Sequence, residues 1–191
     1  MRCMMCERLS FSHICSACRD SLLTPQLHKR KILGNIPVYS FFPYNDIEPL
    51  LLSKHTDVGY YIYTILAKRA FGAFADGWDY ENRVASLGID DHATSGYSHT
   101  AVLNRALKSP NITPQYGKLR ATNHHKYAGK SAEERLLNPR QFRYTSFAEN
   151  EVILVDDIVT TGTTLSEASE ILHTNGKKVI LCLTLTDAEN K

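Results

Sequence analysis

The stretch of residues 151–165 constrains the fold more than any other part of this chain. Val152–Val155 is a branched apolar run, too short for a helix and typical of a strand buried on both faces. Two acids, Asp156 and Asp157, follow where that strand is expected to end. A threonine-rich turn around Gly162 comes next, and helix-spaced apolar residues follow it. This succession predicts a phosphate-binding site.

The turn supplies the hydrogen-bond donors that such a site needs. Gly162 lets the backbone approach a ligand closely, and free N–H groups at the start of a helix attract an anion, aided by a dipole of roughly half an elementary charge. The stretch lacks the Gly-Lys-Ser/Thr of a nucleotide-binding loop and the three glycines of a dinucleotide fingerprint. Its two carboxylates suit ribose hydroxyls, or a magnesium ion bridging to them, with a 5′-phosphate in the turn. The alternative is a ligand-free, threonine-capped helix, but a cap requires one threonine rather than four.

This stretch resembles the 5-phosphoribosyl-1-pyrophosphate (PRPP) motif of type I phosphoribosyltransferases. The resemblance implies that Asp156 and Asp157 hold the ribose hydroxyls and serve as the catalytic residues, while the turn holds the 5′-phosphate. Mg²⁺ would accompany PRPP. The residues implied in PRPP binding are Asp156, Asp157, Ile158, Val159, Thr160, Thr161, Gly162, Thr163 and Thr164.

Four cysteines open the chain as two Cys-x-x-Cys pairs, Cys3 with Cys6 and Cys15 with Cys18. Four thiolates at this spacing can close a tetrahedron around zinc. The segment is too short to bury a core, so metal binding would supply its folding energy, on the order of 10–16 kcal/mol in model peptides. Two disulfides are the alternative, but they do not suit a reducing compartment. We expect a structural zinc finger.

The net charge of +2 conceals two basic blocks. Residues 1–31 carry six Lys/Arg against two acids, and residues 104–143 carry nine against two. Such blocks predict local binding of an anion, either PRPP or nucleic acid, with a solvated surface as the alternative. Tyr116, Tyr127 or Phe142 could stack bases beside the second block. The candidate DNA-binding cations are Lys29, Arg30, Lys31, Arg120, Lys126, Lys130, Arg135 and Arg140.

No apolar run approaches the ~20 residues needed to span a bilayer, and the first residues lack the apolar core of a secretory leader. We therefore expect a cytoplasmic protein without membrane insertion.

Strand and helix patterns alternate in the second half of the chain. Residues 84–89 read as a strand, residues 99–108 as a helix and residues 178–186 as a last buried strand, whereas residues 36–44 read as a short or edge strand. This order predicts an α/β fold with a parallel sheet and with ligands at the carboxyl ends of its strands. The expected organisation is a finger in residues 1–31 and a phosphoribosyltransferase-like domain in 32–191, divided into a hood-like portion (32–82) and a core (83–191).

From residue 3 to about 186, the chain is similar to the ComF (ComFC/GntX-like) family, which joins a four-cysteine finger to a type I phosphoribosyltransferase domain. Besides the finger and the PRPP motif, the similarity lies in Leu52-Ser-Lys54 and in the run 131–142. It implies a competence protein of natural transformation that handles incoming single-stranded DNA in the cytoplasm. It also implies a pyrophosphate loop, whose candidate residues are Asp90, Asp91, His92, Gly96 and Tyr97.

One departure bears on that loop. Residues 95–99 read Ser-Gly-Tyr-Ser-His, where the family usually has Arg-Gly-Phe-Asn-Gln, so contacts to pyrophosphate are expected to differ. Three functions stay open: an active phosphoribosyltransferase with an unidentified acceptor, a DNA-binding module in which PRPP is a ligand or regulator, and an adaptor for a helicase-like partner. We favour the binding module as the biological role.

Overall fold

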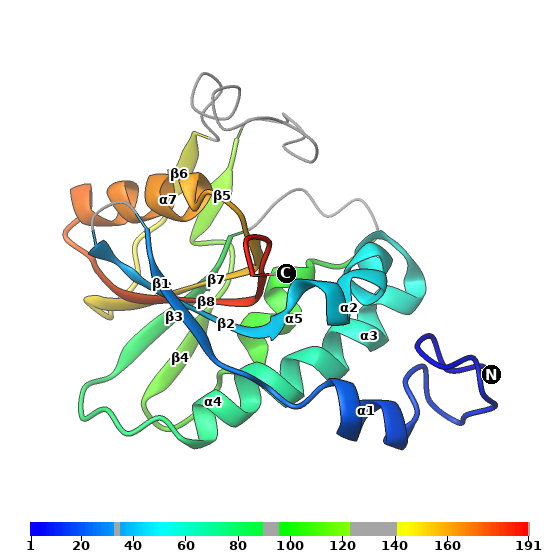
Figure 1. Ribbon diagram of the computed structural model, residues 1–191. Coiled ribbons are helices and arrows are strands. Elements are labelled where there is room, and N and C mark those ends of the chain that lie inside the picture. The colour runs from blue at the N-terminus through cyan, green and yellow to red at the C-terminus, as the bar shows by residue number, and fades with distance from the viewer. Residues whose placement is uncertain (33–34, 90–95, 123–140, 191) are drawn as a thin grey trace.

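The computed structural model describes residues 1–32, 35–89, 96–122 and 141–190. Its main sheet has the strand order β1-β2-β8-β7-β3-β4 (Figure 1). From β2 to β4 every neighbouring pair is parallel, and β1 pairs antiparallel with β2 at one edge. The predicted parallel sheet is therefore confirmed. The strands are β1 (His28–Lys31), β2 (Pro37–Pro43), β3 (Val84–Gly88), β4 (Ile112–Gln115), β7 (Glu151–Val159) and β8 (Lys178–Asp187).

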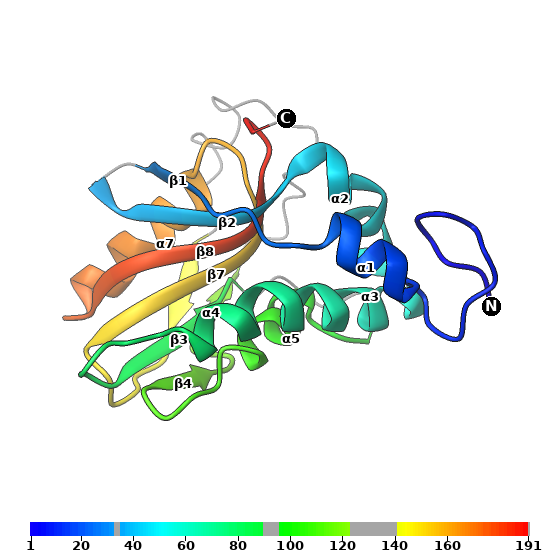
Figure 2. The same ribbon diagram turned by 60° about the horizontal axis from the view of Figure 1, so that its bottom comes forward.

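Helices cover both faces of this sheet, as Figure 2 shows. Helix α7 (Thr163–Thr174) packs on one face, and α3 (Asp57–Ala67) and α5 (His99–Arg105) pack on the other. The remaining helical segments are α1 (Ser16–Leu22), α2 (Tyr44–Leu51), the 3-10 turn Leu52–His55, the π-helical turn Lys68–Gly72 and α4 (Ala73–Asp76). None of the helices in the described ranges has the length and apolar run that crossing a bilayer requires.

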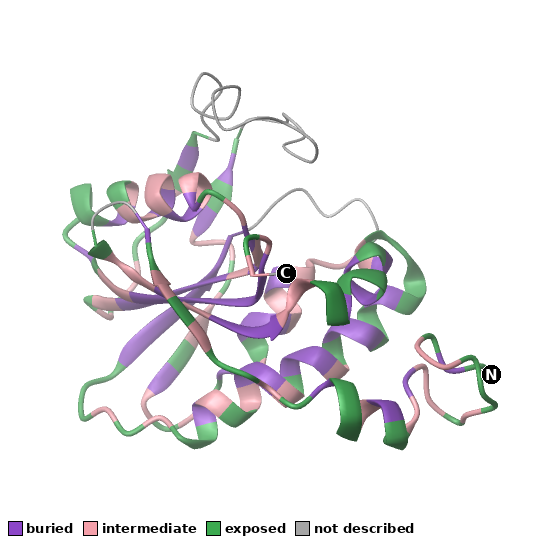
Figure 3. Ribbon diagram, viewed as in Figure 1, coloured by how far each residue is buried: buried purple, intermediate pink, exposed green. Residues whose placement is uncertain are grey.

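The apolar run at residues 152–155 forms the middle of the central strand β7. Side chains alternate between the two faces of a strand. Ile153 and Val155 therefore pack with α3 and α5, while Val152 and Leu154 pack with α7. All four are fully buried, as the colouring of Figure 3 shows for the central strands. Burial on both faces explains why this strand reads as a continuous apolar run.

The N-terminal segment packs against the core of the sheet domain. Ile14 and Leu23 are fully buried and belong to the same apolar cluster as Phe41 and Phe42 of β2. β1 lies within residues 1–31 yet forms the edge of the main sheet, so the division at residue 31 stays a prediction. Residues 36–44, expected as a short or edge strand, form β2. The edge alternative is wrong, because β1 and β8 flank this strand.

A second, two-stranded sheet lies beside α7 (Figure 1). It consists of β5 (Leu119–Ala121) and β6 (Phe142–Tyr144), paired antiparallel. Leu119, Ala121 and Phe142 are buried in the core cluster that contains Leu165 of α7. Phe142 is thus a core residue and does not offer its ring to a base.

Candidate functional site

The two acids of the sequence motif lie inside β7 rather than after it. The strand continues to Val159, with Asp156 opposite Thr184 and Ile158 opposite Thr186 of β8. The expectation that the strand ends at Asp156 is therefore wrong, because pairing with β8 extends it past the apolar run. Consecutive residues of a strand face opposite sides. The two carboxylates consequently lie on different faces of the sheet.

Asp157 lies in the interior, on the face covered by α3 and α5. Only 5% of the surface of Asp157 is exposed. Lys54 Nζ and Tyr63 Oη each donate a hydrogen bond to Asp157 Oδ2 at 3.1 Å, and His99 Nε2 lies 3.5 Å from the same oxygen. The lysine comes from the 3-10 turn before α3, the tyrosine from α3 and the histidine from the start of α5. One carboxylate thus holds three separate elements together.

The electrostatics of Asp157 follow from these neighbours. Burial by itself raises the pKa of this carboxyl. The charges of His99 and Lys54 and the hydrogen bonds from Lys54 and Tyr63 outweigh burial and lower the pKa from 3.8 to about 2. Desolvation of Tyr63, together with the negative charge of Asp157, raises the pKa of the phenol well above 10. Asp157 is therefore an ionised anchor, and Tyr63 is a permanent donor to it.

Tyr97 and Gly59 fix the segment that carries Lys54. Tyr97 Oη donates to the Lys54 carbonyl oxygen at 2.7 Å. A Cβ at Gly59 would lie 2.4 Å from Tyr97 Oη and 2.1 Å from the Ser53 carbonyl oxygen, so only glycine fits there. Of the predicted pyrophosphate-loop residues, Tyr97 therefore acts as a brace for the 3-10 turn, and Gly96 precedes it with a left-handed φ of 79°.

The threonine-rich turn connects β7 to α7 in the way the sequence predicted. Gly162 precedes α7 with a left-handed φ of 79°. The hydroxyls of Thr161 and Thr163 lie 2.8 Å apart on the exposed side of the turn; Thr163 is the first residue of the helix, and Thr164 follows it. The N–H groups of the first turn of a helix have no partner within the helix. The turn therefore offers backbone donors, hydroxyls and a helix dipole to an anion.

Arg30 of β1 fastens this turn to the end of β8. Its guanidinium donates to the Thr160 carbonyl oxygen, and its Nε lies 2.6 Å from Oδ2 of the fully buried Asp187. A weaker contact of 3.3 Å reaches Glu189. Arg30 thus positions the candidate phosphate turn, a role that the basic sequence of residues 29–31 does not reveal.

Replacing Gly162 by alanine is expected to destabilise the turn. An alanine at this φ costs about 1–2 kcal/mol, and its Cβ would lie 2.5 Å from Cγ2 of Ile32. The matched control is Gly176→Ala, because Gly176 has a φ of 74° and open space around it. Urea unfolding should show a larger loss for Gly162→Ala than for Gly176→Ala, and Ile32→Ala should reduce that difference. Equal losses would mean that Ile32 does not confine the turn.

The other predicted site residues fall into three groups. Ile158 and Val159 pack their side chains into the core, so only their backbone could meet a ligand. Lys29 and Lys31 are exposed on β1, and the ammonium of Lys29 lies 5.1 Å from the ring centre of Tyr39. Those that lie outside the described residues are Asp90, Asp91, His92, Lys126, Tyr127, Lys130, Arg135 and Arg140.

The four N-terminal cysteines converge as their spacing predicted. Their Sγ atoms all lie within 4.8 Å of one another, with those of Cys6 and Cys15 3.7 Å apart. A tetrahedral zinc with Zn–S bonds of about 2.3 Å requires S–S distances of about 3.8 Å. The donor set and its dimensions therefore fit zinc.

The protonation of the thiols also favours a metal. Burial and the neighbouring thiols raise the pKa of Cys18 to about 12, whereas hydrogen bonds from backbone N–H groups overcome burial and lower the pKa of Cys3 to about 6. The protein alone thus holds a thiolate at Cys3 but not at Cys18. A divalent cation supplies the charge that four thiolates require.

Residues 115–191 match the phosphoribosyl transferase domain. The match begins at the end of β4 and includes β7, both acids, the threonine turn, α7 and β8. No sequence among curated proteins matches this chain. The predicted fold class is confirmed: an α/β protein with a phosphoribosyltransferase-like parallel sheet and an N-terminal four-cysteine cluster.

Several solved phosphoribosyltransferases have a similar backbone. One from Staphylococcus aureus, for hypoxanthine, is 16% identical with a TM-score of 0.43, and the match covers 68% of this chain and 65% of that chain. The adenine enzyme of Saccharomyces cerevisiae is 16% identical over 91% and 89%, with a TM-score of 0.45. The orotate enzyme of Aeropyrum pernix is 15% identical over 91% and 93%, with a TM-score of 0.40. This chain therefore spans less than two thirds of the Staphylococcus aureus protein.

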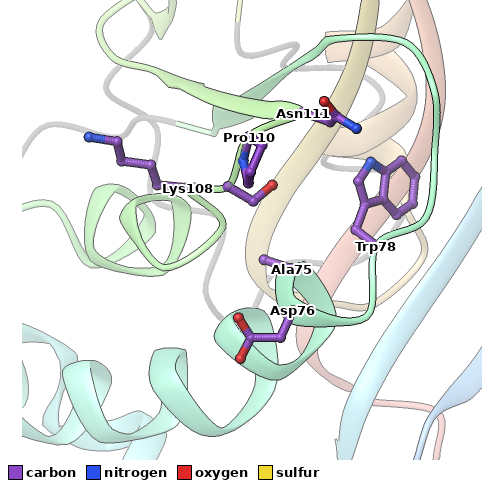
Figure 4. Close-up of a pocket in the computed structure, with 7 residues that line it drawn as sticks. Ala75, Asp76, Trp78, Lys108, Pro110 and Asn111 are labelled. Carbon is purple, nitrogen blue, oxygen red and sulfur yellow. The ribbon is translucent and has the colours of Figure 1, made fainter.

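An open pocket of about 330 Å³ lies beside the segments that lead into the amino ends of β3 and β4 (Figure 4). It is bordered by the end of α4 and by the segment before β4, with Trp78 facing Asn111. These segments precede β3 and β4, whereas the acids and the threonine turn lie at the carboxyl ends of the strands. This pocket is therefore separate from the candidate site.

Proposed function

We propose that the chain binds PRPP with Mg²⁺ at the carboxyl end of β7. The observation that carries this proposal is the turn of residues 160–164, where a left-handed Gly162 and exposed threonine hydroxyls begin helix α7. The family match over residues 115–191 supports it. In this proposal the turn holds the 5′-phosphate, and Asp156 faces the ribose.

The two acids have different roles in the proposal. Asp156 is half-buried and lies on the face of α7, the helix that the turn begins. A single carboxylate, completed by oxygens of the ligand and water, is a donor set that Mg²⁺ accepts. Asp157 already accepts hydrogen bonds from Lys54 and Tyr63 and lies 3.5 Å from His99, so in this proposal it positions these side chains beside the ligand rather than gripping the ribose.

The biological role we propose is that of a ComF-type competence protein. In this proposal it handles incoming single-stranded DNA in the cytoplasm, with PRPP as a ligand or regulator, zinc in the finger, and a helicase-like protein as partner. Exposed cations on β1 and on β5 support the DNA-binding part. Turnover of PRPP with an acceptor base is the alternative function, which the intact turn equally supports.

Calorimetry with PRPP and Mg²⁺ tests the proposal. We expect binding to the wild type and a loss of about 1.5–3 kcal/mol in Asp156→Asn, because a charged hydrogen-bond partner is removed. Glu170→Gln on the exposed side of α7 is the matched control for charge and should bind as the wild type does. An absence of binding, or equal affinity of wild type and Asp156→Asn, would refute the proposed site.

A second assay separates the binding module from the enzyme. Release of pyrophosphate from PRPP in the presence of a panel of nucleobases would establish turnover. Affinity for single-stranded DNA that falls steeply with salt and persists in Asp156→Asn would establish a module that binds DNA independently of the sugar phosphate.

A further inference from the structure

The small sheet of β5 and β6 places two arginines directly opposite each other. Arg120 pairs with Arg143 in the antiparallel register, and both are exposed. Their strand neighbours Leu119, Ala121 and Phe142 are buried, which fixes both arginines on the outer face. Directly opposed residues have Cβ atoms about 4.5–5.5 Å apart, a separation at which like charges destabilise the pair.

Within the described residues, no acid neutralises this arginine pair. Neither Arg120 nor Arg143 makes an ion pair or side-chain hydrogen bond there. Acids on adjoining segments have other partners. Glu149 accepts a hydrogen bond from Gln115 Nε2 at 3.2 Å, and Glu167 accepts one from the Gln141 N–H at 2.8 Å.

The two arginines line an open pocket of about 250 Å³ together with Gly117 and Thr145. Gly117 has a left-handed φ of 62°, and a Cβ there would lie 3.1 Å from a terminal guanidinium nitrogen of Arg120. The guanidinium of Arg120 therefore lies against the backbone of the Gly117 turn. The Thr145 N–H donates to the Lys118 carbonyl oxygen at 2.8 Å, which holds the other side of the pocket to the same turn.

We propose that Arg120 and Arg143 form a binding site for a phosphate oxyanion, separate from the turn of residues 160–164. Guanidinium groups bind phosphate through two parallel hydrogen bonds, and an anion between the two would also remove their mutual repulsion. The open pocket of about 250 Å³ has room for a phosphate group. Because both arginines are exposed, the group can belong to a small phosphate compound or to a phosphodiester chain.

Thermal unfolding at low ionic strength with added inorganic phosphate tests this site. A ligand that binds the folded state raises Tm in proportion to its affinity, so Arg120→Gln and Arg143→Gln should each show a smaller rise than the wild type. Phosphate held at the 160–164 turn raises the Tm of every variant alike, so the difference between variants reports the arginine pair. Without phosphate, both variants should be at least as stable as the wild type, because a repulsion is removed.

Arg83→Gln is the matched control. Arg83 is exposed directly before β3, outside the small sheet of β5 and β6, and its replacement removes the same charge. Its response to phosphate should equal that of the wild type. The proposal is overturned if the three variants respond alike, or if Arg120→Gln and Arg143→Gln respond as the wild type does.

Fluorescence anisotropy with a short single-stranded oligothymidylate identifies the source of the phosphate. If the site takes a phosphodiester, Arg143→Gln should weaken binding about tenfold and lower the slope of log K against log salt by roughly 0.7, the value for one phosphate contact. Arg143→Lys should restore the dependence of affinity on salt but not the full affinity. Lysine keeps the positive charge but lacks the planar guanidinium that makes two parallel hydrogen bonds. Unchanged oligonucleotide binding with an altered response to inorganic phosphate would assign the site to a small compound.

No change in either the phosphate assay or the oligonucleotide assay would overturn the proposed arginine site. PRPP affinity should be equal in all these variants, so failure here is distinct from failure of the proposed PRPP site.

Discussion

Removing metal from the four-cysteine cluster is expected to destabilise the whole chain, not the first residues alone. Cys3 and Cys18 are buried in the same apolar cluster as Phe41, Phe42 and Leu50 of the sheet domain. Zinc binding contributes on the order of 10–16 kcal/mol in finger peptides. If zinc binding adds only about 3 kcal/mol to the free energy of unfolding of the whole protein, its removal lowers Tm by roughly 6–12 °C for a protein of this size. Thermal unfolding before and after chelation, with metal content measured in parallel, checks this.

Cys18→Ala and Cys182→Ala form a matched pair for this prediction. Both thiols are buried, but Cys182 lies in β8, outside the cluster. Only Cys18→Ala should lower the bound zinc, and its Tm should then no longer respond to the chelator. Equal metal content in the two variants, or a wild-type Tm that chelation leaves unchanged, would contradict a structural zinc site. Full PRPP affinity in the metal-free protein would show that the finger folds independently of the site.

Asp157→Ala is expected to cost about 3 kcal/mol of unfolding free energy. Removing one partner of a buried ion pair typically costs 3–5 kcal/mol, and the low end applies because the side chain of Lys54 is 30% exposed and can reach water. Asp156→Ala is the control, since this neighbour lies on the other face and is less buried. Chemical denaturation should show the larger loss for Asp157→Ala, whereas PRPP calorimetry should show the larger loss for Asp156→Ala. The reverse order would exchange the roles assigned to the two acids.

The lowered pKa of Asp157 predicts that the protein loses stability in acid. Its pKa is lowered from 3.8 in the unfolded chain to about 2 in the folded protein, so the folded state favours the ionised form. The contribution is therefore complete above about pH 4 and disappears as pH falls towards 2. The difference of nearly two pKa units makes the contribution of ionised Asp157 to the free energy of unfolding roughly 2 kcal/mol. The stability difference between the wild type and Asp157→Ala should shrink by this amount between pH 5 and pH 2. A constant difference would mean that Asp157 is not the group that titrates.

Local pattern was enough to predict the parallel sheet, the threonine turn before α7 and the convergence of the four cysteines. Each depends on residues close together in the chain. A branched apolar run specifies a buried strand, glycine permits the left-handed turn, and two Cys-x-x-Cys pairs eight residues apart bring four sulfurs together. Such signals keep their meaning in any tertiary context.

The surroundings of the two aspartates, by contrast, were decided by tertiary structure. Lys54 and Tyr63 lie 103 and 94 residues from Asp157 in sequence, and no local pattern indicates that they meet. Pairing with β8 carries β7 past the acids, and the alternation of strand side chains then sends the two carboxylates to opposite faces. Likewise, the register of β5 with β6 makes Arg143 the partner of Arg120. Sequence therefore determined which groups this protein possesses. The long-range pairing of strands determined which of them face each other, because register and face are set by contacts between distant segments.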